Sequence, residues 1–296
     1  EDFFTEVDEN GNYTRPVGSF QPIYMAGYIQ DKFAFKDLIF NVGVRVDRFD
    51  ANQKVLKDPY ILYDYKTVGD MADANGNITL QNGTVVDVPD NIGKDFAVYV
   101  NKVDDISSIV GYRSGNVWYG ADGKEIADPT TLDQGSGISP WLVDPEQRKI
   151  NSASFKDYDP QWSVMPRISF SFPISDEALF FAHYDVLTQR PGNNYTNIYN
   201  YYYFDQISGA INNPTLKPSQ TIDYELSITQ KLTNSSSMTI TGYYRELRNM
   251  IQLYRYTGAY PKDYTSYSNL DFGTVKGFTA SYDLRRTGNV RLRASY

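Results

Sequence analysis

Apolar and polar residues alternate strictly along Thr221-Ile222-Asp223-Tyr224-Glu225-Leu226-Ser227-Ile228, with every even position apolar. Successive side chains of a β-strand point to opposite faces, so a period of two gives a strand with one apolar and one polar face. Eight stretches of the chain show this pattern, and their connections are alternately very short and very long. The sequence therefore predicts an all-β, antiparallel protein in which one face of each strand meets an apolar medium.

The alternation of short turns with long loops indicates which medium this is. Transmembrane β-barrels of the outer membrane have tight periplasmic turns and long extracellular loops. The mean hydropathy of -0.49 is compatible with a barrel, because only the outward half of each strand must be apolar. No run approaches the roughly 20 apolar residues of a transmembrane helix, which excludes a helical membrane protein. We therefore expect an antiparallel transmembrane β-barrel segment in contact with outer-membrane lipid.

Composition excludes several other classes. The chain has no Cys, so neither a disulfide framework nor a thiolate metal site is possible. Its net charge of -8 argues against nucleic acid as a partner. Aromatic residues make up 15% of the chain, with 26 Tyr, whose amphipathic ring suits strands and the membrane–water interface.

The alternating stretches divide the chain into four predicted hairpins. Residues 22–49 form the first, after an N-terminal loop segment over 1–21, and six further strands lie within 161–296. The long connections are 50–160, 191–219 and 255–271, and all three are expected outside the cell. Asn82-Gly83 and Ala121-Asp122-Gly123 are hairpin signals, the first for a two-residue turn, so a small β-rich cap is expected within 50–160.

Three architectures remain open at this point. The eight strands are a part of a larger barrel, a complete eight-stranded barrel, or a β-sandwich. A small barrel rarely carries a loop of over 100 residues, which favours the larger one. A sandwich would bury its apolar faces against each other and would suit a surface adhesin or glycan-binding protein without transport.

Charged residues recur on the polar face of the strands. Positive ones could steer an anionic ligand through a pore, but a paired network lining the lumen is the simpler interpretation. His183 is the single histidine and belongs to this face beside Asp185. The predicted lumen-facing polar residues are Arg45, Asp47, Arg167, His183, Asp185, Asp223, Glu225, Arg245, Arg291 and Arg293.

Aromatic residues in the long loops are the candidates for ligand contact. Exposed rings give a large contact area at a low entropy cost, and so they bind sugar faces and peptide side chains. The same residues could instead pack the loops or form an interfacial girdle, and both alternatives stay open. The candidates are Tyr195, Tyr199, Tyr201, Tyr202, Tyr203, Trp118 and Trp141.

No catalytic signature accompanies these residues. A lone imidazole without a Ser or Cys nucleophile or a second histidine is poor evidence for catalysis or metal binding. The sequence has no Gly-rich phosphate loop, HExxH pair or GxSxG elbow. We therefore expect neither an enzyme nor a cofactor or metal site.

Four segments together are similar to a known family. Residues 28–33 with 40–47 resemble a barrel hairpin of TonB-dependent outer-membrane receptors, and 213–219 leading into 223–226 resembles a loop that descends into a strand. Tyr243-Tyr244-Arg245-Glu246-Leu247-Arg248-Asn249-Met250-Ile251 is similar to the next strand, and residues 273–278 to the one after. In these segments the sequence resembles in particular the SusC-like and Oar-like receptors of Bacteroidetes.

This resemblance implies a 22-stranded barrel with an N-terminal plug, in the outer membrane of a Gram-negative bacterium. Such receptors bind a scarce small-molecule, glycan or peptide ligand and import it with energy relayed by the TonB complex, some with a SusD-like surface lipoprotein. No plug, TonB box or leader precedes Glu1-Asp2, and only about eight strands are present. We therefore expect the chain to be a fragment whose true N-terminus lies upstream.

Overall fold

One open antiparallel sheet of eight strands dominates the computed structural model, which describes residues 5–15, 17–18, 21–135 and 137–296. The strands lie side by side in chain order, so that each pairs with the next alternating stretch of sequence. They are β1 Ile23–Phe35, β2 Leu38–Asp50, β12 Gln161–Ser175, β13 Ala178–Gln189, β14 Ser219–Thr233, β15 Ser236–Tyr256, β16 Tyr264–Thr287 and β17 Val290–Ser295. The predicted all-β antiparallel fold is confirmed.

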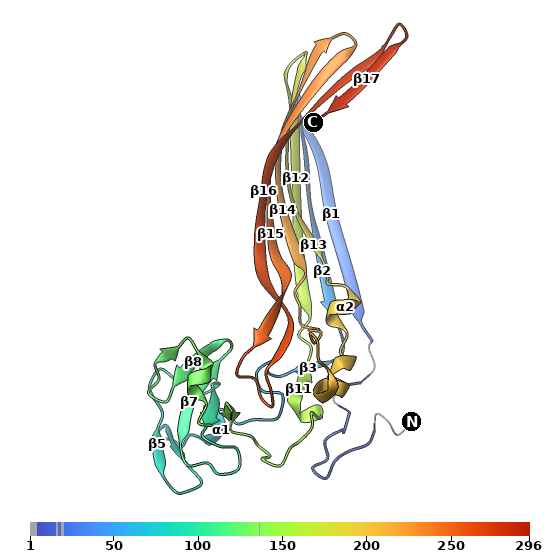
Figure 1. The fold of residues 1–296 in the computed structure, drawn as a ribbon. Helices are drawn as coiled ribbons and strands as arrows, with labels where there is room; N and C mark the ends of the chain where they lie inside the picture. Colours follow the sequence, from blue (N-terminus) through green and yellow to red (C-terminus); the bar gives the residue numbers. More distant parts are fainter. Residues whose placement is uncertain (1–4, 16, 19–20, 136) are drawn as a thin grey trace.

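The two ends of the sheet differ. Tight turns join the strands at one end, whereas the long connections and the small sheets gather at the other (Figure 1). In the turn between β1 and β2, Lys36 takes a positive φ of 55°, which lets the chain reverse within two residues. The asymmetry inferred from loop lengths is thus a property of the fold.

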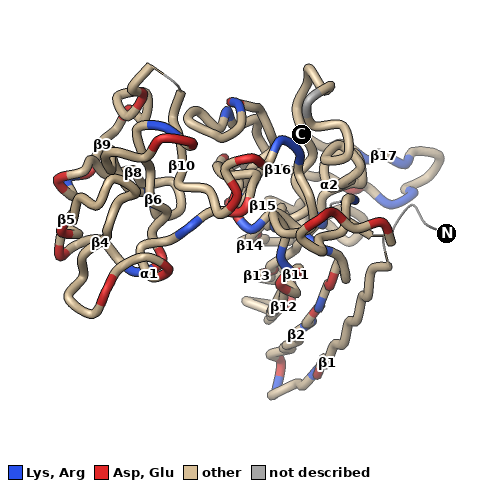
Figure 2. The backbone as a smooth tube through the Cα atoms, turned by 90° about the horizontal axis from the view of Figure 1, so that it is seen from below, with Lys and Arg blue, Asp and Glu red and all other residues tan. Residues whose placement is uncertain are grey.

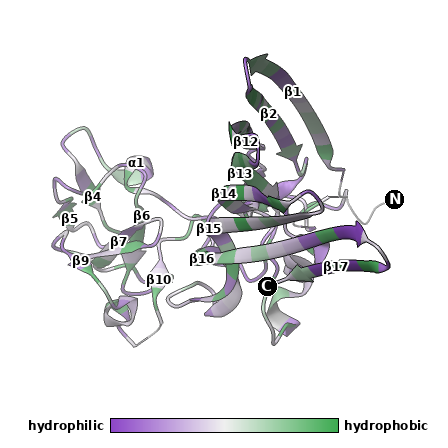
Figure 3. Ribbon diagram, turned by 90° about the horizontal axis from the view of Figure 1, so that it is seen from above, coloured by the Kyte–Doolittle hydropathy of each residue, from purple (hydrophilic) through white to green (hydrophobic). Residues whose placement is uncertain are grey.

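The sheet has the two chemically distinct faces that the alternation predicts. Tyr224, Leu226 and Ile228 share one face, and 42%, 58% and 47% of their surface is exposed. Hydrophobic and hydrophilic residues also alternate over residues 40–47 of β2, the neighbour of β1 in the arc of strands (Figure 3). No second sheet covers the apolar face in the described part of the chain, so the β-sandwich interpretation is wrong.

The sheet curves but does not close on itself. Seen from above, its strands follow an arc from β1 to β17 (Figure 3). Within the described residues, β1 pairs only with β2, and β17 pairs only with β16. The alternative of a complete eight-stranded barrel is therefore also wrong for this chain.

The pair β15–β16 is longer than predicted. These strands contain 21 and 24 residues, whereas β1 and β2 contain 13 each. The loop expected over 255–271 is correspondingly short, because β15 continues to Tyr256 and β16 already begins at Tyr264. A strand that extends beyond the membrane no longer needs an apolar face. The residues directly after Tyr264 therefore lack the strict alternation of apolar and polar residues from which the strands were predicted.

The connection between β2 and β12 forms most of a β-rich cap. A five-stranded sheet has the order β10-β6-β7-β8-β9, and two further pairs are β11 with β3 and β4 with β5. The strands are β3 Lys54–Leu56, β4 Asn77–Thr79, β5 Val85–Asp87, β6 Ala97–Val100, β7 Ile109–Ser114, β8 Val117–Gly120, β9 Glu125–Ile126, β10 Ser139–Pro140 and β11 Phe155–Asp157.

All helices are short. They are α1 Val68–Met71, α2 Asn193–Thr196, η2 Pro129–Leu132, η3 Ser152–Ser154 and η4 Tyr199–Gln206. Among the described residues, no helix has the length and hydropathy needed to span a membrane. The predicted N-terminal segment 1–21 is described only in part, since residues 1–4, 16 and 19–20 lie outside the described ranges.

Both predicted hairpins of the cap are present, but the turn at Asn82-Gly83 differs from the expected one. The Leu80 amide donates to Thr84 and the Gly83 amide to Leu80, which makes a three-residue loop. Gly83 alone supplies the positive φ, at 81°. Ala121-Asp122-Gly123 closes the hairpin between β8 and β9 in the same way, with Gly123 at 76°.

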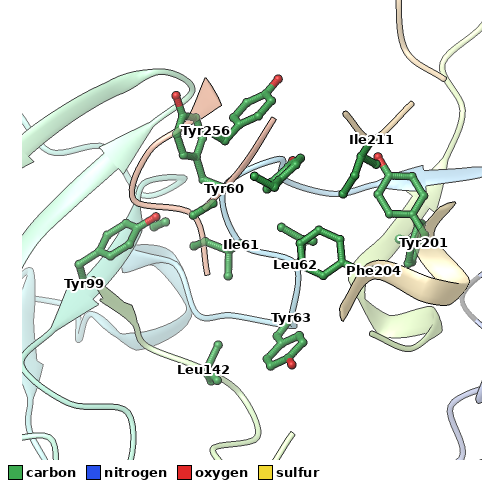
Figure 4. Packing of buried hydrophobic residues seen from close by; sticks show 14 of the residues in the cluster. Tyr60, Ile61, Leu62, Tyr63, Tyr99, Leu142, Tyr201, Phe204, Ile211 and Tyr256 are labelled. Atoms are coloured by element: carbon green, nitrogen blue, oxygen red, sulfur yellow. The ribbon is translucent and has the colours of Figure 1, made fainter. Parts of the chain in front are cut away.

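A single tyrosine-rich core joins three connections that are distant in sequence. It contains Tyr60, Ile61, Leu62 and Tyr63 from the first connection, Tyr201 and Phe204 from the second, and Tyr256 and Tyr264 from the tip of β15–β16. Figure 4 shows segment 60–63 between Tyr99 on one side and Tyr201 and Phe204 on the other. The cap therefore rests on the extended β15–β16 pair and on the loop after β13.

Arg113 lies fully inside this core. Its Nη2 pairs with Oδ2 of Asp58 at 2.5 Å, its Nε donates to the Tyr99 hydroxyl at 2.9 Å, and its guanidinium lies 4.7 Å from the centre of the Tyr60 ring. Burial by itself would lower the pKa of Arg113, but Tyr99 and Asp58 raise it above its ordinary value. The arginine is therefore a permanent buried cation whose charge is balanced by Asp58.

Replacing Asp58 by Asn should destabilise the cap by about 3–5 kcal/mol, because a buried Arg113 would then lack its counter-charge. Urea-dependent proteolysis of the cap, in outer-membrane vesicles that carry the protein, measures this. Asp64→Asn is the matched control, since the Lys57–Asp64 pair at 2.9 Å is partly exposed and worth less than about 1 kcal/mol. Equal protease resistance of both variants would contradict a structural role for the buried pair.

Candidate functional site

The polar face of the large sheet carries a row of paired charges. The Arg245 guanidinium lies between two carboxylates, with Nε 2.9 Å from Asp223 and Nη2 2.8 Å from Glu225. The strands place these residues together, because Asp223 of β14 is directly opposite Arg245 of β15. One guanidinium donates one hydrogen bond to each of the two carboxylates through its fork of donors.

The row continues across β13 and β12. Asp185 is directly opposite Asp223, and Arg167 is directly opposite Asp185. His183 Nε2 lies 3.0 Å from Asp185 Oδ2, and Arg167 Nε lies 3.9 Å from Oδ1. Four adjacent strands thus carry the sequence of charges plus, minus, minus, plus, and the imidazole of His183 lies beside Asp185.

Two smaller networks lie on the same face. Arg45 pairs with Asp47 at 2.8 Å, and both contact the hydroxyl of Tyr24. Charges of both signs are interspersed along β2 in this way (Figure 2). At the tight-turn end, Arg293 pairs with Asp283 at 2.8 Å.

Arg291 lies in a basic groove of about 990 Å³ at the tight-turn end. Lys231, Arg285, Arg286 and Arg293 line the same groove. Unlike Arg293, Arg291 makes no ion pair within the described part of the chain. The structure therefore unites most predicted lumen residues in networks and leaves Arg291 outside them.

Hydroxyl groups fill the polar face between the charges. Ser227 and Thr241 are joined by a hydrogen bond of 2.7 Å, and Thr229 and Thr239 by one of 2.9 Å. No group of three His, Asp or Glu side chains arranged to hold a metal occurs among the described residues. Paired charges and hydroxyls give a hydrophilic wall that is suited to a solvated passage.

Several loop aromatics predicted to contact a ligand are buried instead. Trp118 is 4% exposed and packs edge-on against Tyr60, and Trp141 is 7% exposed in the second core of the cap. Tyr201 is 5% exposed, and burial raises its pKa above the ordinary value. These three rings pack the cap and offer no surface to a ligand, which corrects the expectation.

The remaining loop aromatics differ in their surroundings. Tyr195 packs edge-on against Tyr267 at 4.9 Å, and the Tyr202 hydroxyl donates to the carbonyl of Val17. Tyr199 and Tyr203 are 55% and 56% exposed. They lie four residues apart in η4 and are the two candidates whose rings are available for contact.

Sequence reasoning overlooked Arg190. It follows β13 at the loop end of the sheet, and its guanidinium lies 4.1 Å from the centre of the Phe49 ring and 5.0 Å from that of Tyr24. A cation between the last strand residue and Pro191-Gly192 was the available signal. The partner rings, however, come from β1 and β2, far away in the sequence.

Replacing Arg245 by Gln should weaken the wall by about 1–3 kcal/mol, because two facing carboxylates would lose a charged hydrogen-bond donor. The temperature at which the barrel unfolds should fall, and it is measured as the temperature at which heating changes the mobility of the protein in electrophoresis. Arg248→Gln is the matched control, since Arg248 pairs with Glu246 on the opposite face and is 55% exposed. An unchanged temperature in the Arg245 variant would show that the row is not a stabilising network.

Three solved structures are similar to this chain over most of its length. Hemophore receptor HasR of Serratia marcescens aligns over 90% of this chain at 11% identity, with a TM-score of 0.46. The alcaligin receptor FauA of Bordetella pertussis aligns over 93% at 12% identity and 0.41, and the FrpB iron transporter of Neisseria meningitidis over 93% at 9% and 0.42. The chain spans 32%, 29% and 24% of these three proteins, respectively.

No curated protein sequence matches the chain. The family model for the TonB dependent receptor-like β-barrel, in contrast, matches residues 2–296. It thus covers the large sheet together with the cap and the loops. This family consists of outer-membrane transport proteins of Gram-negative bacteria rather than enzymes. The chain belongs to the TonB-dependent receptor β-barrel family.

Proposed function

We propose that this chain forms part of the wall and the extracellular loops of a receptor that binds a nutrient outside the cell and imports it across the outer membrane. The observation that carries the proposal is the family match over 2–296 on a sheet with an exposed apolar face and a paired polar face. The apolar face contacts lipid, and the polar face lines the passage. Energy would come from the TonB complex through a plug domain of the whole receptor.

The loops are proposed to select the ligand. Tyr199 and Tyr203 expose their rings on η4, in the loop between β13 and β14. Rings of this kind suit a glycan, a peptide or the organic part of a chelate. Lys262 Nζ lies 4.9 Å from the centre of the Phe204 ring, which places a positive charge next to the same helix.

A finer assignment within the family is also proposed. The ordered resemblances over 28–47 and 213–278 support a receptor of the SusC-like or Oar-like type of Bacteroidetes. A receptor of that type would present its loops to a SusD-like surface lipoprotein. Co-purification of such a lipoprotein from detergent-solubilised outer membranes tests the assignment. If no lipoprotein co-purifies, the SusC-like assignment is contradicted and the membership of the family is unaffected.

Deletion of the gene should abolish growth of the producing bacterium on one limiting nutrient from a panel of ferric chelates, oligosaccharides and peptides. Removal of TonB should do the same, because import needs the relayed energy. The double variant Tyr199→Ala, Tyr203→Ala should raise the half-saturating nutrient concentration about tenfold or more, since each exposed ring is worth on the order of 1 kcal/mol.

Val85→Ala is the control, because Val85 is 61% exposed on the outer hairpin of the cap, away from η4. Its uptake should equal that of the unaltered protein. Growth of the deletion strain on every nutrient of the panel would contradict an import function. Unchanged uptake by the double variant would contradict only the role of the two rings.

A further inference from the structure

A cavity of about 250 Å³ lies where β2, β12 and β13 reach the loop end of the sheet. Phe49, Ala51 and Leu216 give it apolar walls, together with prolines of the neighbouring loops. The helix α2 borders it through Asn193 and Thr196, so the cavity adjoins the loop that carries Tyr199 and Tyr203. Apolar walls with a few polar groups are the usual composition of a small-molecule site.

Arg190 is the only Lys, Arg, Asp or Glu among the described residues lining this cavity. Its guanidinium is held against the rings of Phe49 and Tyr24, at 4.1 Å and 5.0 Å from their centres. Within the described part of the chain it makes no ion pair or hydrogen bond, in contrast to Arg45 and Arg245 on the polar face. The fork of donors is therefore positioned by the rings and free to bind an anion.

A second polar group is also unpartnered. The Oε1 atom of Gln53, which lines the cavity, is buried and has no hydrogen-bond partner among the described residues. A buried acceptor without a partner costs free energy that a ligand hydroxyl or amine would recover. Tyr158, which also lines the cavity, stays an uncharged phenol at neutral pH, since burial raises its pKa to about 12.

The structure assigns this cavity to a small monocarboxylic acid with an apolar body and a hydroxyl or amino group. The carboxylate binds the Arg190 guanidinium, the body lies between Phe49 and Leu216, and the donor binds Oε1 of Gln53 when the Gln53 side chain turns this buried atom into the cavity. A single cation suits a monoanion, whereas a phosphate dianion would need a second one. The assignment rests on the proposed function, in that such an acid is the imported nutrient or a part of it.

Three related probes test the two polar contacts separately, in outer-membrane vesicles that carry the protein. They are 4-hydroxyphenylacetate, its amide, which lacks the charge, and phenylacetate, which lacks the donor. Saturation-transfer NMR titrations give each dissociation constant, with vesicles that lack the protein as the blank. The hydroxy acid should bind at least tenfold more tightly than the amide and several-fold more tightly than phenylacetate.

Two variants should each remove one preference. Arg190→Gln should bind the acid and the amide equally, and Gln53→Met should bind the hydroxy acid and phenylacetate equally while it keeps the preference for acid over amide. Arg148→Gln, at a 67% exposed arginine on the surface of the cap, should change neither ratio. Because ratios are compared, a general loss of folded protein does not imitate these results.

Equal binding of acid and amide by the unaltered protein, no binding of any probe, or an acid preference that survives in Arg190→Gln would each overturn the assignment. Binding is read without import, so a failure of the proposed transport would leave these ratios unchanged. Intact nutrient uptake by Arg190→Gln, with the acid preference lost, would show that the site exists but does not serve the imported nutrient.

Discussion

Every backbone N–H and C=O group inside a hydrocarbon layer must be paired within the protein, and this constraint shapes the whole molecule. The large sheet meets it by joining each strand to the next in chain order, so that among the eight strands of this sheet only β1 and β17 keep an edge unpaired within the described residues. Side chains are then free to differ between the two faces. The apolar face needs no protein partner, because lipid is its partner.

The polar face obeys the opposite rule. Charges next to a low-dielectric wall are costly unless they are paired, and here Arg245, Asp223 and Asp185 lie in one register across neighbouring strands. Pairing keeps the wall hydrophilic without leaving strong isolated charges along it. Arg190 and Arg291 depart from this rule, and they lie at the loop end and the tight-turn end of the sheet, respectively.

The strands could be predicted because lipid enforces a period of two, and the cap hairpins because Gly83 and Gly123 mark their turns. The first part of β16, over residues 264–271, could not, since outside the membrane neither face of a strand must be apolar. The aromatic loop candidates were ambiguous for a related reason. A tyrosine that packs, Tyr201, and one that is exposed, Tyr203, lie two residues apart in the same tyrosine-rich run, and only long-range packing distinguishes them.

The length of β15–β16 has a mechanical consequence. Gly43 of β2 and Arg245 of β15 lie in the same row of the sheet, and β2 continues from that row to Asp50 whereas β15 continues to Tyr256. At about 3.3 Å per residue, β15 therefore reaches about 13 Å further toward the cap than β2 does. The tip of this ribbon is clamped to the first connection by backbone hydrogen bonds between Tyr260 and both Tyr60 and Leu62. The ribbon therefore couples the cap rigidly to the barrel wall. A force that pulls on the cap from outside would be transmitted along β15 and β16 into the wall, whereas a flexible linker would absorb it.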